Sequence, residues 1–124
     1  MSRGGAGDPA DMPSAIDAAN AIRDGRLSAT ELVGRCLDRI EARNDELHAF
    51  VHVDAEGALT AAEQVDRVVA EGRSDQLGPL AGVPFGVKDL EDCAGMPTSH
   101  GSLLYLGGEP VAHDSIHVAR LRSA

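Results

Sequence analysis

Lysine is almost absent from this chain, which has a single one, Lys88, among its 124 residues. The other fixed positive charges are all arginines. An arginine keeps its proton at any working pH, whereas a lysine packed in apolar surroundings can lose its proton. Lys88 is therefore the residue that composition marks as a candidate base. A lysine on an edge strand that points into water is the alternative reading of the same residue.

Aromatic residues are also scarce, with two Phe, one Tyr and no Trp in a chain that is 43% apolar. Small residues supply much of that apolar content, so each buried side chain contributes little area. A core built in this way is thin for a domain of this length. The composition predicts helices that need a larger surface to pack against.

Positive charge is outnumbered, and the formal net charge is −9. This argues against a nucleic-acid binder and against a protein that binds anionic membranes, because both need a basic surface. No apolar run approaches the length of a membrane span. Residues 1–13 are polar and glycine-rich without the apolar core of a signal peptide. They are predicted to be a flexible leader, and the chain to be cytoplasmic.

Cysteine is limited to Cys36 and Cys93, too few for a disulfide framework in a chain without a secretion signal. Both are predicted to be reduced thiols. Cys36 falls on the apolar face of a predicted helix and is expected to be a small core residue. Cys93 as a nucleophile is a weaker alternative, since no oriented histidine partner is indicated.

Two histidine pairs have metal-like spacing, but neither predicts a site. His48 and His52 flank a predicted strand and would lie about 13 Å apart, too far to share an ion. His113 and His117 could meet on a helix, yet the glutamate of a zinc-protease motif and a third ligand are both missing. Asp114 is instead expected to cap that helix. No metal and no cofactor are predicted.

Caps and apolar periodicity predict three helices before residue 72. The first runs over 14–24, with Ser14 as its cap and Gly25 as its stop. The second starts with a capping box at Ser28 and ends near residue 43, and the third runs over 54–71. The interior positions expected on these helices are Ile16, Ala19, Ile22, Leu32, Val33, Cys36, Leu37, Ile40, Leu59, Ala62, Val65 and Val69. On the surface, Glu31 and Arg35 are expected to pair.

Two short strands are predicted, one over 49–53 and one over 80–88. The second has an apolar run with glycines, ends at Lys88, and has Pro84 where an edge or strand start would tolerate it. The Gly- and Pro-containing loop that follows lies where binding and catalytic groups concentrate. Helices followed by the first strands of a sheet indicate an α/β layered fold.

The stretch 78–102, GPLAGVPFGVKDLEDCAGMPTSHGS, resembles the N-terminal motif block of the amidase signature family. The later segment 114–124, DSIHVARLRSA, is similar to the helix that follows this block in the family. Two ordered blocks at compatible spacing are more specific than one short motif. The resemblance implies that residues 14–124 are the N-terminal part of an amidase domain, with the first strands of an α/β/α fold and the rest of that domain as their partner.

Family members hydrolyse amides with a nucleophilic serine, a second serine in a cis peptide, and a lysine as the ultimate base. Lys88 matches that lysine, and the glycine- and serine-rich segment that carries the two serines has no counterpart here. The resemblance implies an amidase acting on a small-molecule amide in its full-length form, with this chain inactive by itself. Two alternatives stay open: the glutamine-hydrolysing A subunit of an aminoacyl-tRNA amidotransferase, and a non-catalytic interaction module. A homodimer also stays open.

Three polar residues near Lys88 complete the expectations. Ser99 and Ser102 invite a serine–lysine dyad, but we expect them to bond loop backbone, because serines do so in glycine-rich turns. Asp89 points away from Lys88 if the backbone there is extended, so that its carboxylate need not neutralise the amine. We expect Asp89 to anchor the loop.

Overall fold

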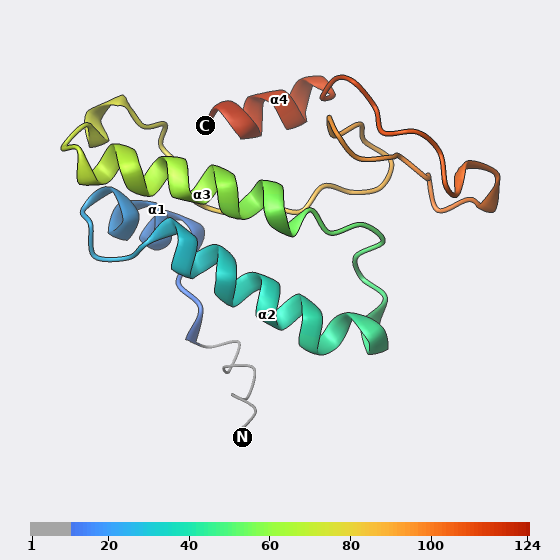
Figure 1. Cartoon of the computed structure of the whole chain (residues 1–124), viewed down its shortest axis with the longest axis horizontal. Helices are drawn as coiled ribbons and strands as arrows, with labels where there is room; N and C mark the ends of the chain where they lie inside the picture. The colour runs from blue at the N-terminus through green and yellow to red at the C-terminus, as the bar shows by residue number, and fades with distance from the viewer. Residues whose placement is uncertain (1–10) are drawn as a thin grey trace. The chain divides into compact units, whose positions relative to one another are not determined.

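The structure is a computed structural model that describes residues 11–124. Its elements in chain order are α1 (Ala15–Arg23), α2 (Ala29–Leu47), α3 (Ala55–Ala70), the 3-10 turns η2 (Ser74–Gln76) and η3 (Leu103–Tyr105), and α4 (Ile116–Ser123) (Figure 1). The described residues form two compact units. Residues 11–50 and 55–84 are called the helical unit, and residues 51–54 and 85–124 the loop unit.

Side-chain caps begin the first two helices where the sequence predicts them. The Ser14 hydroxyl accepts a hydrogen bond from the Asp17 amide, and the Ser28 hydroxyl accepts one from the Glu31 amide. Each bond satisfies an amide that the first helical turn leaves without a partner. Gly25, at φ 73°, takes the left-handed conformation after α1, as predicted for a helix stop.

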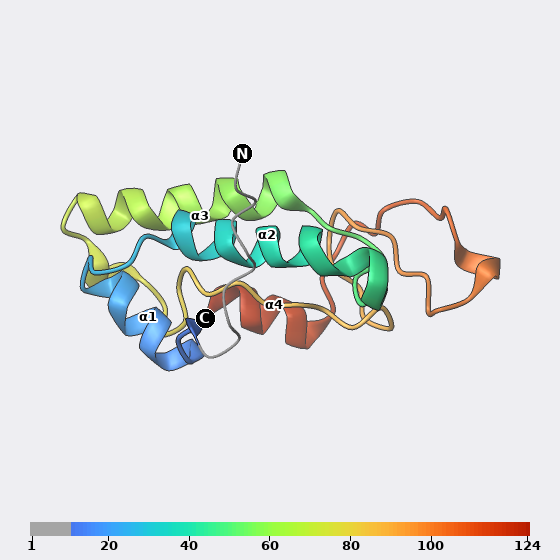
Figure 2. The same ribbon diagram turned by 90° about the horizontal axis from the view of Figure 1, so that it is seen from below.

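The core of the helical unit lies where α1, α2 and α3 meet. Helices α2 and α3 run side by side in both views (Figures 1 and 2). The buried members of this core are Ala18, Ile22, Ala29, Leu32, Val33 and Ala62. Partly buried residues that pack against it include Leu37, Leu59, Val65 and Val69. The predicted interior face is therefore largely confirmed.

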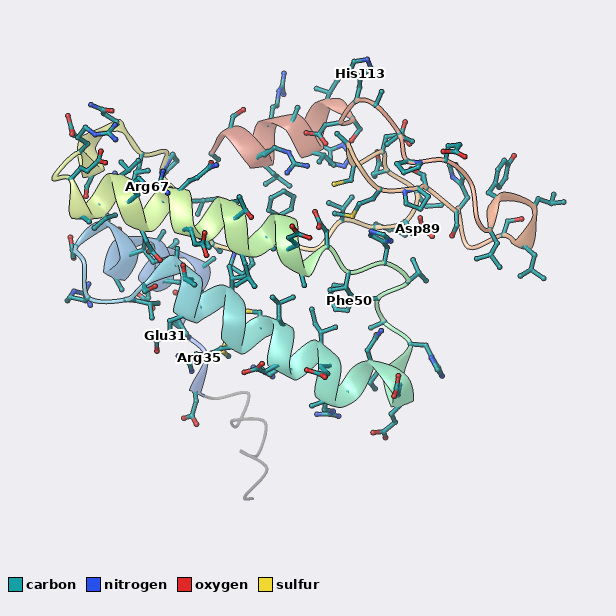
Figure 3. The ribbon with its side chains drawn as sticks, in the orientation of Figure 1. Glu31, Arg35, Phe50, Arg67, Asp89 and His113 are labelled. Atoms are coloured by element: carbon teal, nitrogen blue, oxygen red, sulfur yellow. The ribbon has the colours of Figure 1, made fainter. Side chains whose placement is uncertain are left out.

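Three details of the helix predictions are wrong. Ile16 is 68% exposed, because it lies on the first turn of α1, away from the core that Ala18 and Ile22 enter. Helix α2 continues to Leu47 rather than ending near residue 43. Arg35 donates to the Asp11 carbonyl at 3.0 Å, and no ion pair with Glu31 forms, although both residues lie on α2 (Figure 3).

The predicted strands are not formed by the described residues, so the α/β expectation is not confirmed here. Residues 48–54 and 82–88 have neither helical nor ladder structure. A strand exists only when its amides and carbonyls pair with a neighbour. No backbone hydrogen bond between described residues joins these two segments to each other or to a third. The apolar run over residues 80–87 is present, but a pairing partner for it is not among residues 11–124.

The loop unit is closed by hydrogen bonds. Gly95 donates to the Val111 carbonyl at 2.9 Å, and Val111 donates to the Met96 carbonyl at 3.0 Å. Asp114 does not cap α4, because Ser115 occupies that position and makes no capping bond. The Asp114 carboxylate accepts from the Ala94 amide at 2.7 Å instead. That bond closes the loop between residues 94 and 114.

None of the helices within residues 11–124 combines the length and the hydrophobicity needed to cross a lipid bilayer. Of the predicted leader, residues 1–10 lie outside the described residues.

Candidate active site

Lys88 lies at the end of the extended segment of the loop unit, just before a turn. Its carbonyl accepts from the Glu91 amide at 3.0 Å, which closes that turn. The side chain is exposed, and among residues 11–124 it makes no hydrogen bond or ion pair. Lys88 thus lacks the apolar surroundings that would favour a neutral amine, and its exposure matches the alternative of a lysine that points into water. Burial needs a second layer over the segment, and the described residues near Lys88 provide none.

Asp89 follows Lys88 directly and accepts hydrogen bonds from a segment ten residues later. Its Oδ1 accepts from the Ser99 amide at 2.7 Å, and its Oδ2 accepts from the Ser99 hydroxyl. These two bonds lower the pKa of Asp89 below its ordinary value, with a smaller contribution from the Gly101 amide. Asp89 thus anchors the loop, as predicted, and Figure 3 marks its place in it. We call this arrangement the Asp89 clamp.

The backbone around the clamp is unusual. His100 and Gly101 have φ values of 55° and 66°, a left-handed conformation that turns the chain back sharply. A non-glycine residue in this region is uncommon. The two residues directly follow Ser99, so the strained turn and the clamp form one local structure.

The neighbouring serine and threonine make local bonds of their own. Ser102 accepts from the Leu104 amide at 3.2 Å, which confirms the expectation that it bonds loop backbone. Ser99 differs, because its hydroxyl donates to the Asp89 carboxylate rather than to a carbonyl. Thr98 donates to Asp92 Oδ1 at 2.7 Å. Neither serine contacts Lys88, so the described chain contains no serine–lysine dyad.

The two cysteines are free thiols in different settings. Cys93 is buried, and Arg122 Nη2 donates to its sulfur at 3.3 Å. Arg122 also bonds both carboxylate oxygens of Asp114, at 2.8 and 3.0 Å. This pairing, with the Ala94 amide, lowers the pKa of Asp114 to about 2. Cys36 is only partly buried, and that burial raises the pKa of its thiol.

The histidines do not gather around a common point. His113 precedes α4, whereas His117 lies on it and faces Glu91 with an Nε2–Oε2 distance of 3.6 Å. No three potential metal ligands cluster among the residues that the structure describes. His48 ends α2 in a left-handed conformation, with φ 50°.

Comparison with known proteins settles the family. The amidase family model matches residues 31–124, which include the whole 78–102 block and Lys88. The chain therefore belongs to the amidase family. The resemblance drawn from the motif block is confirmed at this level.

Two curated relatives illustrate the similarity and share one name. The A subunit of glutamyl-tRNA(Gln) amidotransferase from Salinispora arenicola is 49% identical over 90% of this chain. The protein of the same name from Streptomyces coelicolor is 41% identical over the same share. The chain spans 22% of the length of each of these relatives.

Two solved structures have a backbone fold similar to that of this chain. Two structures of a vestigial protein complex related to an s-triazine catabolic enzyme, one of them inhibitor-bound, superpose with TM-scores of 0.83 and 0.81. Both are 32% identical in sequence to this chain and are covered over 24% of their own length. The helices and loops described above are thus shared with chains about four times as long.

Sequence reasoning missed how this region is connected. The Asp89–Ser99 pair joins residues ten apart, and the Arg122–Asp114 pair joins residues eight apart. Neither spacing matches a helix or strand period. The available signal was the position of an aspartate beside a loop, because an aspartate carboxylate tends to accept hydrogen bonds from nearby loop amides and hydroxyls.

Proposed function

We propose that this chain is the N-terminal part of an amide hydrolase that releases ammonia from glutamine, as the A subunit of a glutamyl-tRNA(Gln) amidotransferase. The observation that carries the proposal is the family match over residues 31–124. The shared name of relatives that are 49% and 41% identical supports the choice of glutamine as substrate. The partners would be the remaining part of the amidase domain and the other subunits of the amidotransferase.

Lys88 is the base in this proposal. A neutral Lys88 amine takes a proton through a bridging serine from the nucleophilic serine, whose oxygen then attacks the amide carbon. The carbon–nitrogen bond breaks, and ammonia leaves with a proton returned along the same path. Water then hydrolyses the acyl-enzyme. Neither serine is assigned to a residue of this chain.

The lack of an ion pair at Lys88 supports this role. A carboxylate in contact with the amine would hold the proton on the lysine. Among residues 11–124 no carboxylate occupies that position. The proposal also requires the amine to be covered in the working enzyme, which the longer relatives have the additional length to do.

A graft tests the proposal. Residues 14–124 replace the matching part of the Salinispora arenicola protein, and glutaminase activity is measured in the assembled amidotransferase. We expect activity in the graft, and at least a 10³-fold loss in the Lys88→Ala graft, on the order of losing a catalytic base. An inactive graft that still assembles, or a Lys88→Ala graft of full activity, would rule the function out.

A second candidate is hydrolysis of another small amide by an enzyme outside tRNA metabolism. The solved neighbours favour it, because their complex is related to an s-triazine catabolic enzyme. An assay of the protein encoded by the whole reading frame distinguishes the two, because the graft keeps most of the Salinispora arenicola chain. Ammonia released from simple aliphatic amides but not from glutamine supports the second candidate.

Sequencing the reading frame past codon 124 tests the non-catalytic alternative directly, since a serine-rich amidase segment in frame argues against it.

A further inference from the structure

We propose that Asp89 is a positioning residue for Lys88, and that Ser99 holds its carboxylate away from the lysine amine. This inference rests on the proposed function, because it concerns the base of that reaction. It goes further by assigning a task to Asp89 and Ser99, which touch no reacting atom.

The backbone at Lys88 is fixed on its C-terminal side twice. The turn that its own carbonyl makes with Glu91 holds it once, and the clamp on the next residue holds it again. The clamp bonds both carboxylate oxygens to one residue, Ser99, so rotation of the carboxylate would break two bonds at once. A side chain that must meet a proton donor needs a fixed backbone, because displacement by about 1 Å can cost about 10²-fold in rate.

The charge of Asp89 is kept from Lys88 as well. Asp89 is the carboxylate nearest to Lys88 in sequence, yet the two form no ion pair. Its charge is satisfied by Ser99 and by the Gly101 amide. Without the Ser99 hydroxyl, Oδ2 would lose its partner. The carboxylate would then be free to turn toward the amine and keep it protonated.

The two other acidic groups that follow Lys88 most closely in sequence, Glu91 and Asp92, already have partners. Asp92 accepts from Thr98 at 2.7 Å, and Glu91 faces His117 at 3.6 Å. The Asp92–Thr98 bond lies close in sequence to the Asp89–Ser99 clamp. It differs in that Asp92 is not adjacent to Lys88, whereas Asp89 is. Thr98→Val is therefore a matched control, because it removes one hydroxyl-to-carboxylate bond from the same loop.

The single lysine makes the test direct. Labelling the 124-residue chain with ¹⁵N-lysine gives one Nζ signal, because Lys88 is the only lysine. In Ser99→Ala we expect the midpoint of its titration to move up by about one pH unit, as for an amine gaining a carboxylate neighbour. Ser99→Thr, which keeps the hydroxyl, and the double variant Asp89→Asn/Ser99→Ala, which removes the charge, should both stay near the parent.

Measurements of kcat, KM and the pH profile of the grafted enzyme supply a second, independent test of the clamp. Ser99→Ala should lower kcat about tenfold with little change in KM, and should move the acidic limb of the pH profile upward, because the base must be neutral to act. Thr98→Val should leave both unchanged. Equal effects of Ser99→Ala and Thr98→Val, or an unmoved lysine signal in Ser99→Ala, would overturn the clamp. If Lys88→Ala leaves the graft active, the proposed function fails instead, whatever the clamp variants do.

Discussion

The helical unit and the loop unit differ in the kind of interaction that stabilises each of them. Seven of the nine buried apolar residues within 11–124 belong to the helical unit. Ten of the thirteen exposed large apolar side chains belong to the loop unit, among them Leu103 and Leu104 at 86% and 90% exposure. The helical unit thus has a small apolar core, whereas the loop unit is connected by hydrogen-bonded side chains such as the Asp89 clamp and the Arg122–Asp114 pair. Apolar burial stabilises the first, and hydrogen bonds fix the second in place.

The same isoleucine truncation should distinguish the two units most strongly. Ile22 is 1% exposed in the core, and Ile22→Ala should cost about 3 kcal/mol, because it leaves a cavity and loses buried area. Ile116, at the start of α4, is 76% exposed, and Ile116→Ala should change stability by less than about 0.5 kcal/mol. Urea unfolding followed by helical circular dichroism measures both. Similar costs would remove the contrast between the units.

Two glycines with the same backbone angle sharpen the comparison. Gly82 and Gly95 have φ values of 84° and 85°. A Cβ on Gly82 would lie 2.9 Å from Ile22 Cδ1 and 3.0 Å from Ala29 Cβ, whereas one on Gly95 meets nothing within 4 Å. Gly95→Ala should cost about 1 kcal/mol for the backbone alone. Gly82→Ala should cost about 2 kcal/mol in the same urea experiment, because the core must move. Equal losses of stability in the two variants would mean that the core around Gly82 accommodates the added methyl group without cost.

Asp66 forms a polar clamp within the helical unit, and loss of this clamp should cost less stability than truncation of a core residue. Asp66 on α3 accepts from the Ala29 and Thr30 amides at 2.7 and 3.0 Å, at the start of α2. Asp66→Ala should cost about 1 to 2 kcal/mol, as for other lost helix caps. Glu63→Ala, at an exposed position of the same helix, is the control and should be near neutral in thermal melts.

The same clamp should make stability depend on acid. Partial burial alone would raise the pKa of Asp66, but hydrogen bonds from Thr30, Ser28 and Ala29 outweigh it and lower the pKa. Its contribution is therefore complete above the ordinary carboxyl value of about 3.9 and is lost as the pH falls through the lower folded value. Urea midpoints should drop below pH 4 in the parent and drop less in Asp66→Ala. Parallel pH curves would contradict this account.

The smallest expected effect is local to the loop unit. The carboxyl ¹³C signal of Asp114 should titrate at about 2, because Arg122 and the Ala94 amide bond its charged form. Arg122→Gln should move that midpoint toward the ordinary value of about 3.9. Arg120→Gln, on the same helix, should leave it in place. An unchanged midpoint in Arg122→Gln would show that the pair is not formed in solution.

The same division explains what sequence reasoning could predict. Helix starts at Ser14 and Ser28 and the interior residues Ile22 and Leu32 follow from local rules, because caps and 3.6-residue periodicity act within one segment. The extended segments were not confirmed as strands, because pairing depends on a partner that local sequence does not specify. The Asp89 clamp was only half predicted. An acidic anchor could be expected beside the loop, but not its partner Ser99.

Exposure of Lys88 shows the same limit. Its role was inferred from a motif, and its burial from the apolar run before it. The motif is supported by the family match over residues 31–124, whereas the burial is not observed within the described chain. A short apolar run indicates which residues can be buried. The elements that bury them come from other parts of the fold, so the run alone does not predict burial.

The most direct test of Lys88 as base is glutaminase activity of the grafted enzyme with Lys88→Arg, measured from neutral to alkaline pH. Arginine keeps the charge and nearly the reach of lysine but cannot release its proton. The account predicts no recovery of turnover at any pH in a graft that still assembles with its partner proteins. Turnover close to that of the lysine enzyme would show that the residue serves as a fixed cation, and the assignment of Lys88 as the base would be wrong.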